Sequence, residues 1–574
     1  MKRTVGIGHQ DFEYIRQNNL FYIDKTSFLA QWWQSNDSVT LITRPRRFGK
    51  TLNMSMTEKF FSLNYSGRKD LFEGLLIWEQ EAYRKLQGTY PVITFSFANI
   101  KEKDYSTARR KICQILSNLY SQYNFICHSD ILDNREKDFF ESVSADMDDV
   151  TATMAVHQLA LFLHRYYNKK VIILLDEYDT PMQEAYVNGY WEEITGFMRS
   201  MLNATFKTNP YMERAIMTGI TRITKESIFS DLNNLKVITT TSEKYADCFG
   251  FTEQEVFSAL DEFGLSDRKE EVKEWYDGFT FGNRKDIYNP WSVLNYLDTQ
   301  KIAAYWAHSS ANSLVEKLLR EGSRGVKQDF EKLMYPESIT IEIDEAIAYE
   351  QLAVKKNAVW SLLLAGGYLR VIKTEFQNDT GRWYYTLSLT NKEVYGMFEN
   401  MIRTWFSDSE ESYSDFIQAL LSDDVDSMND FMNRIAMSSF SFFDTGRESS
   451  DAEPERFYHG FVLGLMVELK DRYILSSNRE SGLGRYDIML KPRELEKEHD
   501  KKGRWADDYI IMEFKVFQPK REKELSDTVK AALGQIEDRK YAQTLLARGI
   551  LPERIRKYGF AFHGKQVLIG RQME

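Results

Sequence analysis

Cysteine is scarce in this chain of 574 residues, which has only Cys113, Cys127 and Cys248. Three widely spaced thiols provide neither a disulfide framework nor the ligand spacing of a zinc site, so we expect a reducing compartment. Long apolar runs are also absent: "VIILL" at 171–175 is far too short to span a membrane. The N-terminus "MKRTVGIGHQDFEYIRQNN" has no apolar signal-peptide core. These absences predict a cytoplasmic protein without a membrane partner.

Positive charge is in deficit, since 74 Lys and Arg residues stand against 85 Asp and Glu residues, a formal net charge of −11. This negative net charge argues against a protein that binds DNA over its whole surface. A local basic groove can still attract an anionic partner. Apolar residues make up 43% of the chain and aromatic residues 14%, which allows large cores and excludes general disorder. The length exceeds that of a single core, so we expect an α/β protein of several domains.

Strand-like runs alternate with helical segments through residues 1–242. This alternation predicts a P-loop type domain, a parallel sheet with helices on both faces. The expected strands lie at 38–45, 90–100, 169–179, 214–224 and 236–242.

Beyond residue 242 the pattern changes. Residues 243–437 are predicted as a helical middle region, in which the order helix, strand, turn, strand, helix from Val359 onward is winged-helix-like. A polar stretch at 438–456 is predicted as a linker. Residues 457–574 then form a second α/β domain.

The run "RPRRFGKT" at 44–51 follows the first expected strand and precedes a helical pattern. In a phosphate-binding loop, successive backbone N–H groups surround phosphate oxygens at a helix N-terminus, a lysine reaches the terminal phosphates, and the next hydroxyl binds Mg²⁺. Gly49, Lys50 and Thr51 match the second half of this motif, but Arg44 holds the place of its first glycine. Arg44 and Arg46 could add charge toward phosphate. The alternative is a chance GKT at a helix start.

A second motif makes chance a poor explanation. The apolar strand "VIILLDEYD" ends in Asp176 and Glu177, which suit an aspartate that holds Mg²⁺ and a glutamate that polarises the attacking water. A solvated strand end is the simpler interpretation of this pair. Thr218, Thr221 and Arg222 follow the next strand, where a γ-phosphate sensor is expected.

The segments "FYIDKTSFLAQWW", "LITRPRRFGKTLNMSM", "ILLDEYDTPM", "TGITRITKESIFSDLNNL" and "WYDGFTFG" resemble the bacterial AAA-ATPase-like family whose members carry a C-terminal PD-(D/E)XK nuclease-like domain. The resemblance spans nearly the whole chain. It implies that the arginine-rich loop is the family's own P-loop and that the ligand is ATP with Mg²⁺. AAA-like ATPases often form rings, which leaves a homo-oligomer open. The expected nucleotide-binding residues are Arg44, Arg46, Arg47, Phe48, Gly49, Lys50, Thr51 and Asp176.

The C-terminal strands contain Asp487 and, on the next strand, Glu513-x-Lys515. Two carboxylates from adjacent strands can hold Mg²⁺, and a lysine two residues after the second lies on the same strand face and can orient the attacking water. Phe514 should then face the core. A solvated ion pair between Glu513 and Lys515 is the alternative. Because "YIIMEFKVF" is otherwise apolar, we favour a metal site, with Mg²⁺ or Mn²⁺.

The segments "YHGFVLGL", "SNRESGLGRYDIML", "IIMEFKV" and "AALGQIEDRKYA" resemble the nuclease-like domain of the same family. This implies a restriction-endonuclease-like fold in which Asp487, Glu513 and Lys515 form the catalytic core and Gln535 supports it. Arg485 is a further phosphate contact in this interpretation. The third acidic ligand stays open among Glu455, Glu468 and Glu480.

Two functions fit these motifs. The first is an ATP-binding protein that cuts nucleic acid, with DNA as the expected substrate because restriction-type folds mostly act on it. The second is a nucleotide-dependent switch that binds nucleic acid or a protein without cutting, which the net charge of −11 favours. Loss of metal-dependent cleavage in a Lys515 variant would separate them.

Overall fold

The computed structural model of the protein divides the chain into two compact units, Met1–Met397 and Phe398–Glu574. The residues described are 3–572 except 223–228, 230–231, 308–312, 321, 323, 335–336, 344–351, 353–355, 380, 406–409, 440–468, 470–471, 478–479, 482–483, 486–487, 494–507, 519–520 and 564–565. Within these ranges no helix combines the length and the apolar character needed to cross a membrane.

The first unit is built on a five-stranded parallel sheet of strand order β2-β3-β4-β1-β5. Every residue of β1 and β3 is buried, as expected for parallel strands covered on both faces. All five predicted strands are therefore confirmed. Their bounds are β1 (Val39–Thr43), β2 (Val92–Ser96), β3 (Val171–Asp176), β4 (Met212–Gly219) and β5 (Leu235–Ile238).

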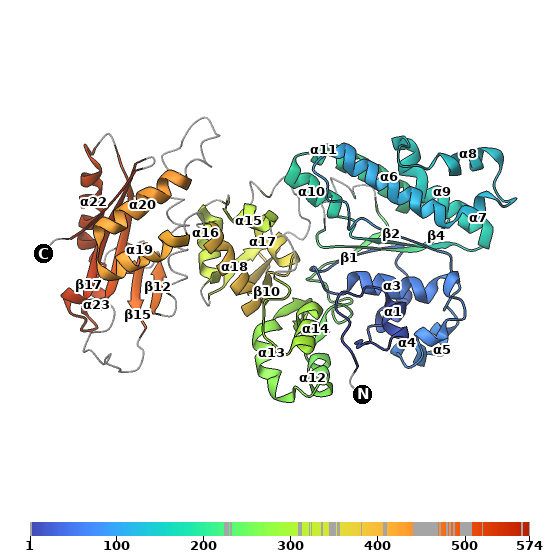
Figure 1. The fold of residues 1–574 in the computed structure, drawn as a ribbon, viewed down its shortest axis with the longest axis horizontal. Helices are drawn as coiled ribbons and strands as arrows, with labels where there is room; N and C mark the ends of the chain where they lie inside the picture. Colours follow the sequence, from blue (N-terminus) through green and yellow to red (C-terminus); the bar gives the residue numbers. More distant parts are fainter. Residues whose placement is uncertain are drawn as a thin grey trace. The chain divides into compact units, whose positions relative to one another are not determined.

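Helices cover both faces of this sheet (Figure 1). On one face lie α1 (Phe12–Gln17), α3 (Lys50–Phe61), α4 (Leu76–Glu79) and α5 (Glu81–Arg84). On the other lie α6 (Tyr105–Gln122), α7 (Asn124–Cys127), α8 (Asn134–Ser142), α9 (Asp149–Tyr167), α10 (Thr180–Asn188) and α11 (Trp191–Phe206). The short α2 (Ser27–Ser35) precedes β1.

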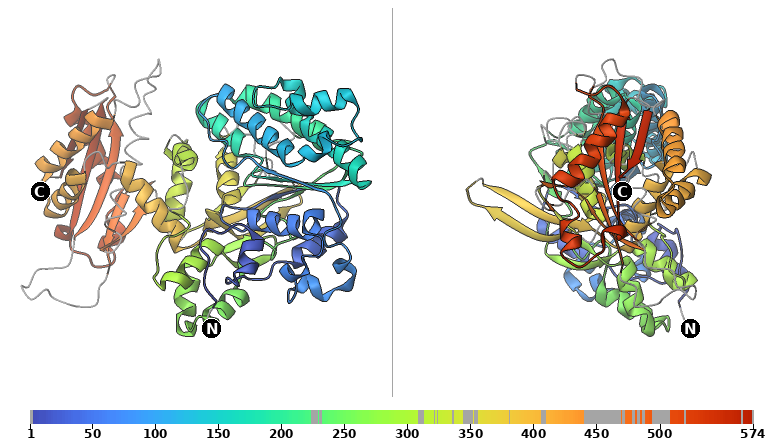
Figure 2. Two further views of the ribbon diagram at one scale, coloured as in Figure 1. Left: turned by 45° about the vertical axis from the view of Figure 1, so that its right-hand side comes forward. Right: turned by 90° about the vertical axis from the view of Figure 1, so that its left-hand side faces the viewer.

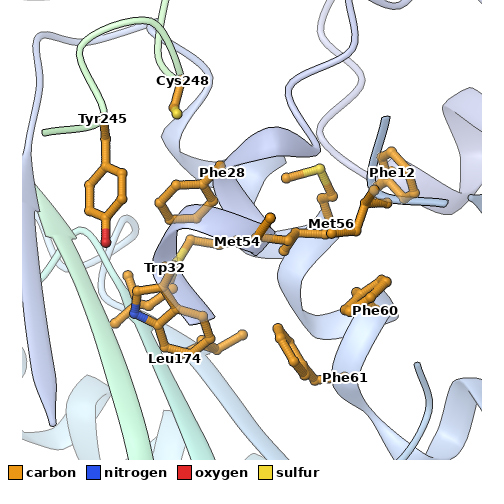
Figure 3. Close-up of a cluster of buried hydrophobic side chains, with 14 of the residues drawn as sticks. Phe12, Phe28, Trp32, Met54, Met56, Phe60, Phe61, Leu174, Tyr245 and Cys248 are labelled. Carbon is orange, nitrogen blue, oxygen red and sulfur yellow. The ribbon is translucent and has the colours of Figure 1, made fainter. Parts of the chain in front are cut away.

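Helix α3 is fixed to the sheet by large apolar side chains (Figure 3). Met54, Phe60 and Phe61 of α3 belong to one buried cluster with Trp32 and with Leu174 of β3. Aromatic and methionine side chains bury much apolar area, so this cluster holds the helix firmly. The start of α3, which follows the arginine-rich loop, is thereby held at the end of β1.

The middle of the chain forms two small antiparallel sheets and several helices, which belong to the first unit except for the part of the last helix beyond Met397. One sheet has the order β6-β8-β7 and the other β10-β11-β9. The strands are β6 (Phe251–Thr252), β7 (Phe279–Phe281), β8 (Arg284–Tyr288), β9 (Ile339–Glu342), β10 (Leu369–Gln377) and β11 (Arg382–Leu389). The helices are α12 (Glu253–Glu262), α13 (Lys269–Tyr276), α14 (Pro290–Thr299), α15 (Ser313–Arg320), α16 (Arg324–Met334), α17 (Lys356–Ala365) and α18 (Lys392–Trp405).

The predicted order from Val359 onward is confirmed, because α17, β10, β11 and α18 follow one another as helix, strand, strand and helix. The β10–β11 hairpin projects from its unit in the right-hand view of Figure 2. Helix α12 begins with a capping box, in which Thr252 and Glu255 exchange hydrogen bonds between side chain and backbone.

The second unit contains a mixed sheet of order β12-β15-β16-β17-β18 with helices on both faces. Its helices are α19 (Glu410–Ser422), α20 (Val425–Ser439), α22 (Leu525–Asp538) and α23 (Gln543–Leu546). Its strands are β12 (Tyr473–Ser477), β13 (Glu480–Ser481), β14 (Gly484–Arg485), β15 (Ile488–Pro492), β16 (Tyr509–Val516), β17 (Ile555–His563) and β18 (Gln566–Arg571).

Residues 410–437 were expected to belong to the middle region, but α19 and α20 pack on the C-terminal sheet. The reason is that their apolar residues share one buried cluster with the strands, including Leu420 and Met432 with Ile510. The predicted linker lies outside the described residues from 440 onward.

Candidate nucleotide and nuclease sites

The arginine-rich loop (residues 44–49) joins β1 to the N-terminus of α3. Gly49 is the residue before the helix and has a φ of +78°, and Arg47 also adopts a positive φ, of +65°. A helix leaves its first N–H groups without partners inside the helix, and these groups attract anions. The loop therefore has the backbone shape expected of a phosphate-binding turn, although it lacks the first glycine.

Arg44, which replaces the first glycine of the usual motif, supports the loop backbone with its side chain. Its side chain is fully buried, donates to the carbonyl oxygens of Thr43 (3.0 Å) and Thr239 (2.5 Å), and lies 4.5 Å from the ring centroid of Phe281. Burial lowers the pKa of the Arg44 guanidinium to about 9. The structure thus places Arg44 beneath the loop, where it braces the backbone, and not among the residues that line the adjoining cavity.

Lys50 is buried at the start of α3. Its ammonium group donates to the carbonyl oxygens of Arg44 (3.0 Å) and Pro45 (2.9 Å). Burial lowers the pKa of Lys50, while the nearby Glu177 and Asp176 oppose this shift. The lysine therefore bridges the loop at the place where phosphate charge would be neutralised.

Asp176 lies at the end of β3 and is only 4% exposed. It accepts a hydrogen bond from the Thr51 hydroxyl at 2.7 Å and another from the Thr218 hydroxyl. Burial raises the pKa of Asp176, although both hydroxyls oppose the shift. Because Mg²⁺ prefers oxygen ligands, the adjacent Thr51 and Asp176 oxygens fit a magnesium ion.

Glu177 follows Asp176 with a positive φ of +51° and lines the adjoining cavity. A left-handed conformation is uncommon for a residue with a Cβ atom and indicates a position determined by its surroundings. The Glu177 N–H donates to the Thr218 hydroxyl at 3.3 Å. The structure thus brings the expected acid pair and Thr218 together.

Thr221 has a different partner from the one expected of a phosphate sensor. Its N–H and its hydroxyl both donate to Asp179 at 2.8 Å. Asp179 is 1% exposed, and burial raises its pKa. Sequence reasoning missed this carboxylate, although it is the last acid of "DEYD". Asp179 connects the start of α10 to the end of β4 beside the site.

The loop opens into a cavity of about 710 Å³. Its lining includes Glu177 and Gln183, the N-terminal segment 8–10, and Trp291 of α14. The expected nucleotide residues that line it are Arg46, Arg47, Phe48, Gly49, Lys50 and Thr51. Sequence reasoning missed the N-terminal segment, for which the paired glycines of "GIGHQ" are the one available signal. This cavity has the size of a small-molecule site, with polar groups at the loop.

The second candidate site lies on β16. Glu513 is 3% exposed, and the Gln535 side-chain amide, from α22, donates to it. The same amide donates to the Tyr541 hydroxyl at 3.1 Å. Alternation along β16 places Lys515 on the face of Glu513, while Phe514 packs on the other face, 4.8 Å from the ring of Phe560. The buried carboxylate, the lysine and the amide thus share the sheet face that α22 covers.

The remaining predicted nuclease residues are only partly placed. Asp487, Glu455 and Glu468 lie outside the described residues. Glu480 and Arg485 are paired across the β13–β14 hairpin, whose side chains are also outside the description. The metal-ligand role of Asp487 and the identity of a third acidic ligand therefore stay predictions.

Comparisons with known proteins match the two parts of the chain that contain these candidate sites. Residues 6–229 match the model of a family described as predicted AAA-ATPase, and residues 453–572 match that of the PD-(D/E)XK nuclease superfamily. An uncharacterized protein in the vnfD 5′ region of Azotobacter chroococcum mcd 1 is 25% identical over 396 residues, 68% of each chain. A structure of the Aeropyrum pernix ORC2 protein (ADPNP–ADP complexes) covers 69% of this chain and 95% of its own at 10% identity, with a TM-score of 0.24 that is too low to carry an argument.

The parallel sheet and its loop define the first unit as a P-loop NTPase-like fold. The chain combines a stretch at 6–229 that matches the predicted AAA-ATPase family with a stretch at 453–572 that matches the PD-(D/E)XK nuclease superfamily. This is the combination that the sequence motifs resemble.

Proposed function

We propose that the protein is a metal-dependent nuclease that cuts phosphodiester bonds in DNA and is governed by Mg-ATP bound in the first unit. The observation that carries the nuclease assignment is the burial of Glu513, which is 3% exposed and accepts a hydrogen bond from Gln535 on the strand face that also carries Lys515. A buried carboxylate that shares a strand face with a lysine and is oriented by an amide is a donor set typical of a metal-dependent hydrolytic site. Bound Mg²⁺ would compensate this charge and stabilise the charge that develops on the phosphate.

The chain's own residues then have distinct tasks. Glu513 would hold the ion together with the predicted ligand Asp487, and Gln535 orients the Glu513 carboxylate through its hydrogen bond. Lys515 lies on the same strand face, where its ammonium group can orient the attacking water. The expected DNA substrate rests on the superfamily and not on a basic surface.

The nucleotide assignment rests on the loop cavity. Lys50 and the first backbone N–H groups of α3, which receive no side-chain cap, would bind the phosphates, and Thr51 with Asp176 would hold Mg²⁺. Glu177, which lines the cavity beside them, would polarise a water molecule for hydrolysis.

A cleavage assay tests both the metal-dependent nuclease activity and its control by ATP. Linear, supercoiled and single-stranded DNA are incubated with Mg²⁺ or Mn²⁺, with and without ATP. We expect wild type to cut and Lys515→Ala to lose at least about 100-fold of the rate, because general acid–base groups typically contribute 10²–10⁴-fold. The matched control is Lys557→Ala: Lys557 lies on the same sheet face of β17 but pairs with Glu537.

Nucleotide affinity is measured separately with a fluorescent ATP analogue. Lys50→Ala should weaken binding about 10- to 100-fold, the value of one or two charged hydrogen bonds. Lys59→Ala, on the same helix but paired with Glu58 and Asp11, should retain it. Nucleotide binding without any cleavage by wild type would instead support the switch that binds a partner without cutting.

A further inference from the structure

The carbonyl oxygen of Arg46, within the arginine-rich loop, is held from outside the sheet. It accepts a hydrogen bond from the Trp306 indole N–H at 3.0 Å and a longer one from the Asn289 amide at 3.5 Å. Both donors come from the middle of the chain, more than 240 residues after the loop. The loop therefore depends on contacts outside the β1–α3 segment that forms it.

Trp306 is itself rigidly placed. Its side chain is 4% exposed, and its ring lies 5.6 Å from the ring of Phe279 and 5.4 Å from that of Tyr368. Its backbone N–H donates to a carboxylate oxygen of Glu393 at 2.5 Å. An indole fixed by rings on its sides and by its own backbone can define the direction of the hydrogen bond it donates.

Glu393 completes this set of contacts. It is fully buried in the first turn of α18 and also accepts from the Ser292 hydroxyl at 2.8 Å and the Ala307 N–H at 3.4 Å. These donors are all neutral, so the carboxylate is satisfied by hydrogen bonds to α14 and to the backbone at 306–307. A carboxylate buried in this way holds several segments together at a fixed geometry.

We propose that Trp306, held by Glu393, is a positioning residue of the nucleotide site. In a planar trans peptide the carbonyl of one residue and the N–H of the next point in opposite directions. Holding the Arg46 carbonyl on the Trp306 side therefore aims the Arg47 N–H away from it, toward bound phosphate.

This inference rests on the proposed nucleotide binding, and Trp306→Phe tests it. Phenylalanine keeps the ring packing but removes the indole N–H. The matched control is Trp360→Phe in α17, because Trp360 is fully buried and its Nε1 has no hydrogen-bond partner among the described residues.

Hydrogen exchange without nucleotide gives the first measurement. Trp306→Phe should speed exchange in peptides that cover residues 44–51, and Trp360→Phe should not. Affinity for the fluorescent ATP analogue gives the second: Trp306→Phe should weaken it about three- to tenfold, the value of one neutral hydrogen bond, with little change for Trp360→Phe.

A pair of substitutions at Glu393 tests whether this carboxylate holds Trp306 in place. Glu393→Gln keeps an oxygen that can accept from the Trp306 N–H and should preserve loop protection, whereas Glu393→Ala should lose it. Unchanged loop exchange and affinity in Trp306→Phe would overturn the inference. If wild type binds no nucleotide, the proposed function fails, and the exchange measurement still decides whether Trp306 positions the loop.

Discussion

Several ionisable side chains are buried around the arginine-rich loop, and three of them show different ways of compensating burial. Arg44 uses backbone carbonyls and aromatic rings, Asp176 uses two hydroxyls, and Glu393 uses a hydroxyl and two backbone N–H groups. Hydrogen bonds reduce the free-energy cost of burying a charge without cancelling it. The pKa values of buried charged groups are therefore shifted from their ordinary values. Burial lowers the pKa of Arg44 to about 9 and raises that of Glu393 to about 7.

The Glu393 shift predicts a pH dependence of stability. Its pKa in the folded state, about 7, lies above the ordinary value of 4.5, so the folded state binds more protons between these values. The stability that Glu393 contributes therefore falls as pH rises through this window, by on the order of 3 kcal/mol. A glutamine at this position cannot titrate, so the Glu393→Gln variant should lack this decrease of the free energy of unfolding with pH.

The measurement is denaturant unfolding of wild type and Glu393→Gln from pH 5 to pH 8, followed by tryptophan fluorescence. Wild type should lose stability relative to the variant as the pH increases. Glu342→Gln, at a half-buried position at the end of β9, serves as the control. A stability difference between wild type and Glu393→Gln that is constant over this range would contradict the prediction.

At the scale of elements, helix α20 protects an edge of the C-terminal sheet. β18 is the last strand of that sheet, and its free backbone groups are taken by two asparagines of α20. Asn429 exchanges two hydrogen bonds with the backbone of Ile569 (2.9 and 2.7 Å), and Asn433 does the same with Val567 (2.8 and 2.9 Å). The spacing of one helical turn between the two asparagines thus matches the spacing of alternate residues along β18. Their side-chain amides make the hydrogen bonds that a neighbouring strand would otherwise make.

Asn433→Ala should lower the free energy of unfolding of the second unit by about 1–3 kcal/mol, because it leaves a backbone N–H and a carbonyl of Val567 unpaired. Chemical denaturation followed by far-ultraviolet circular dichroism measures this. Gln418→Ala, at an exposed position of α19, should change the stability by less than about 0.5 kcal/mol. Equal effects of the two substitutions would show that the asparagine pairs do not stabilise the sheet.

At the scale of the whole molecule, the second unit begins well before the residues that match the nuclease superfamily. That match starts at residue 453, whereas the compact unit starts at Phe398. Phe416 and Phe431, from α19 and α20, are buried in one cluster with Phe560 of the central strands. A sheet face stripped of these helices would expose a contiguous apolar surface.

We therefore expect a fragment of residues 398–574 to fold cooperatively and a fragment of residues 457–574 to aggregate or remain unfolded. Thermal unfolding and size-exclusion chromatography of the two fragments test this. Cooperative unfolding of the shorter fragment at the same temperature would show that α19 and α20 are dispensable for the fold.

The parallel sheet and both candidate sites were accessible from sequence because their signals are local. An apolar run that ends in Asp176–Glu177 predicts a buried strand with acids at its end, and alternation around Glu513 predicts which side chains share a face. The direction of the Arg44 side chain was not accessible, because it depends on Thr239 and Phe281, which are remote in sequence. The contribution of α19 and α20 was missed for the same reason.

The amino-acid sequence by itself determined the five parallel strands, the loop before α3 and the Glu513–Lys515 spacing. Each of these follows from the periodicity and backbone preference of neighbouring residues. Only the tertiary structure decided that Arg44 braces the loop from below and that Trp306 holds it from the side. These contacts join segments about 200 and 260 residues apart, and burial between such segments depends on packing that no local pattern encodes.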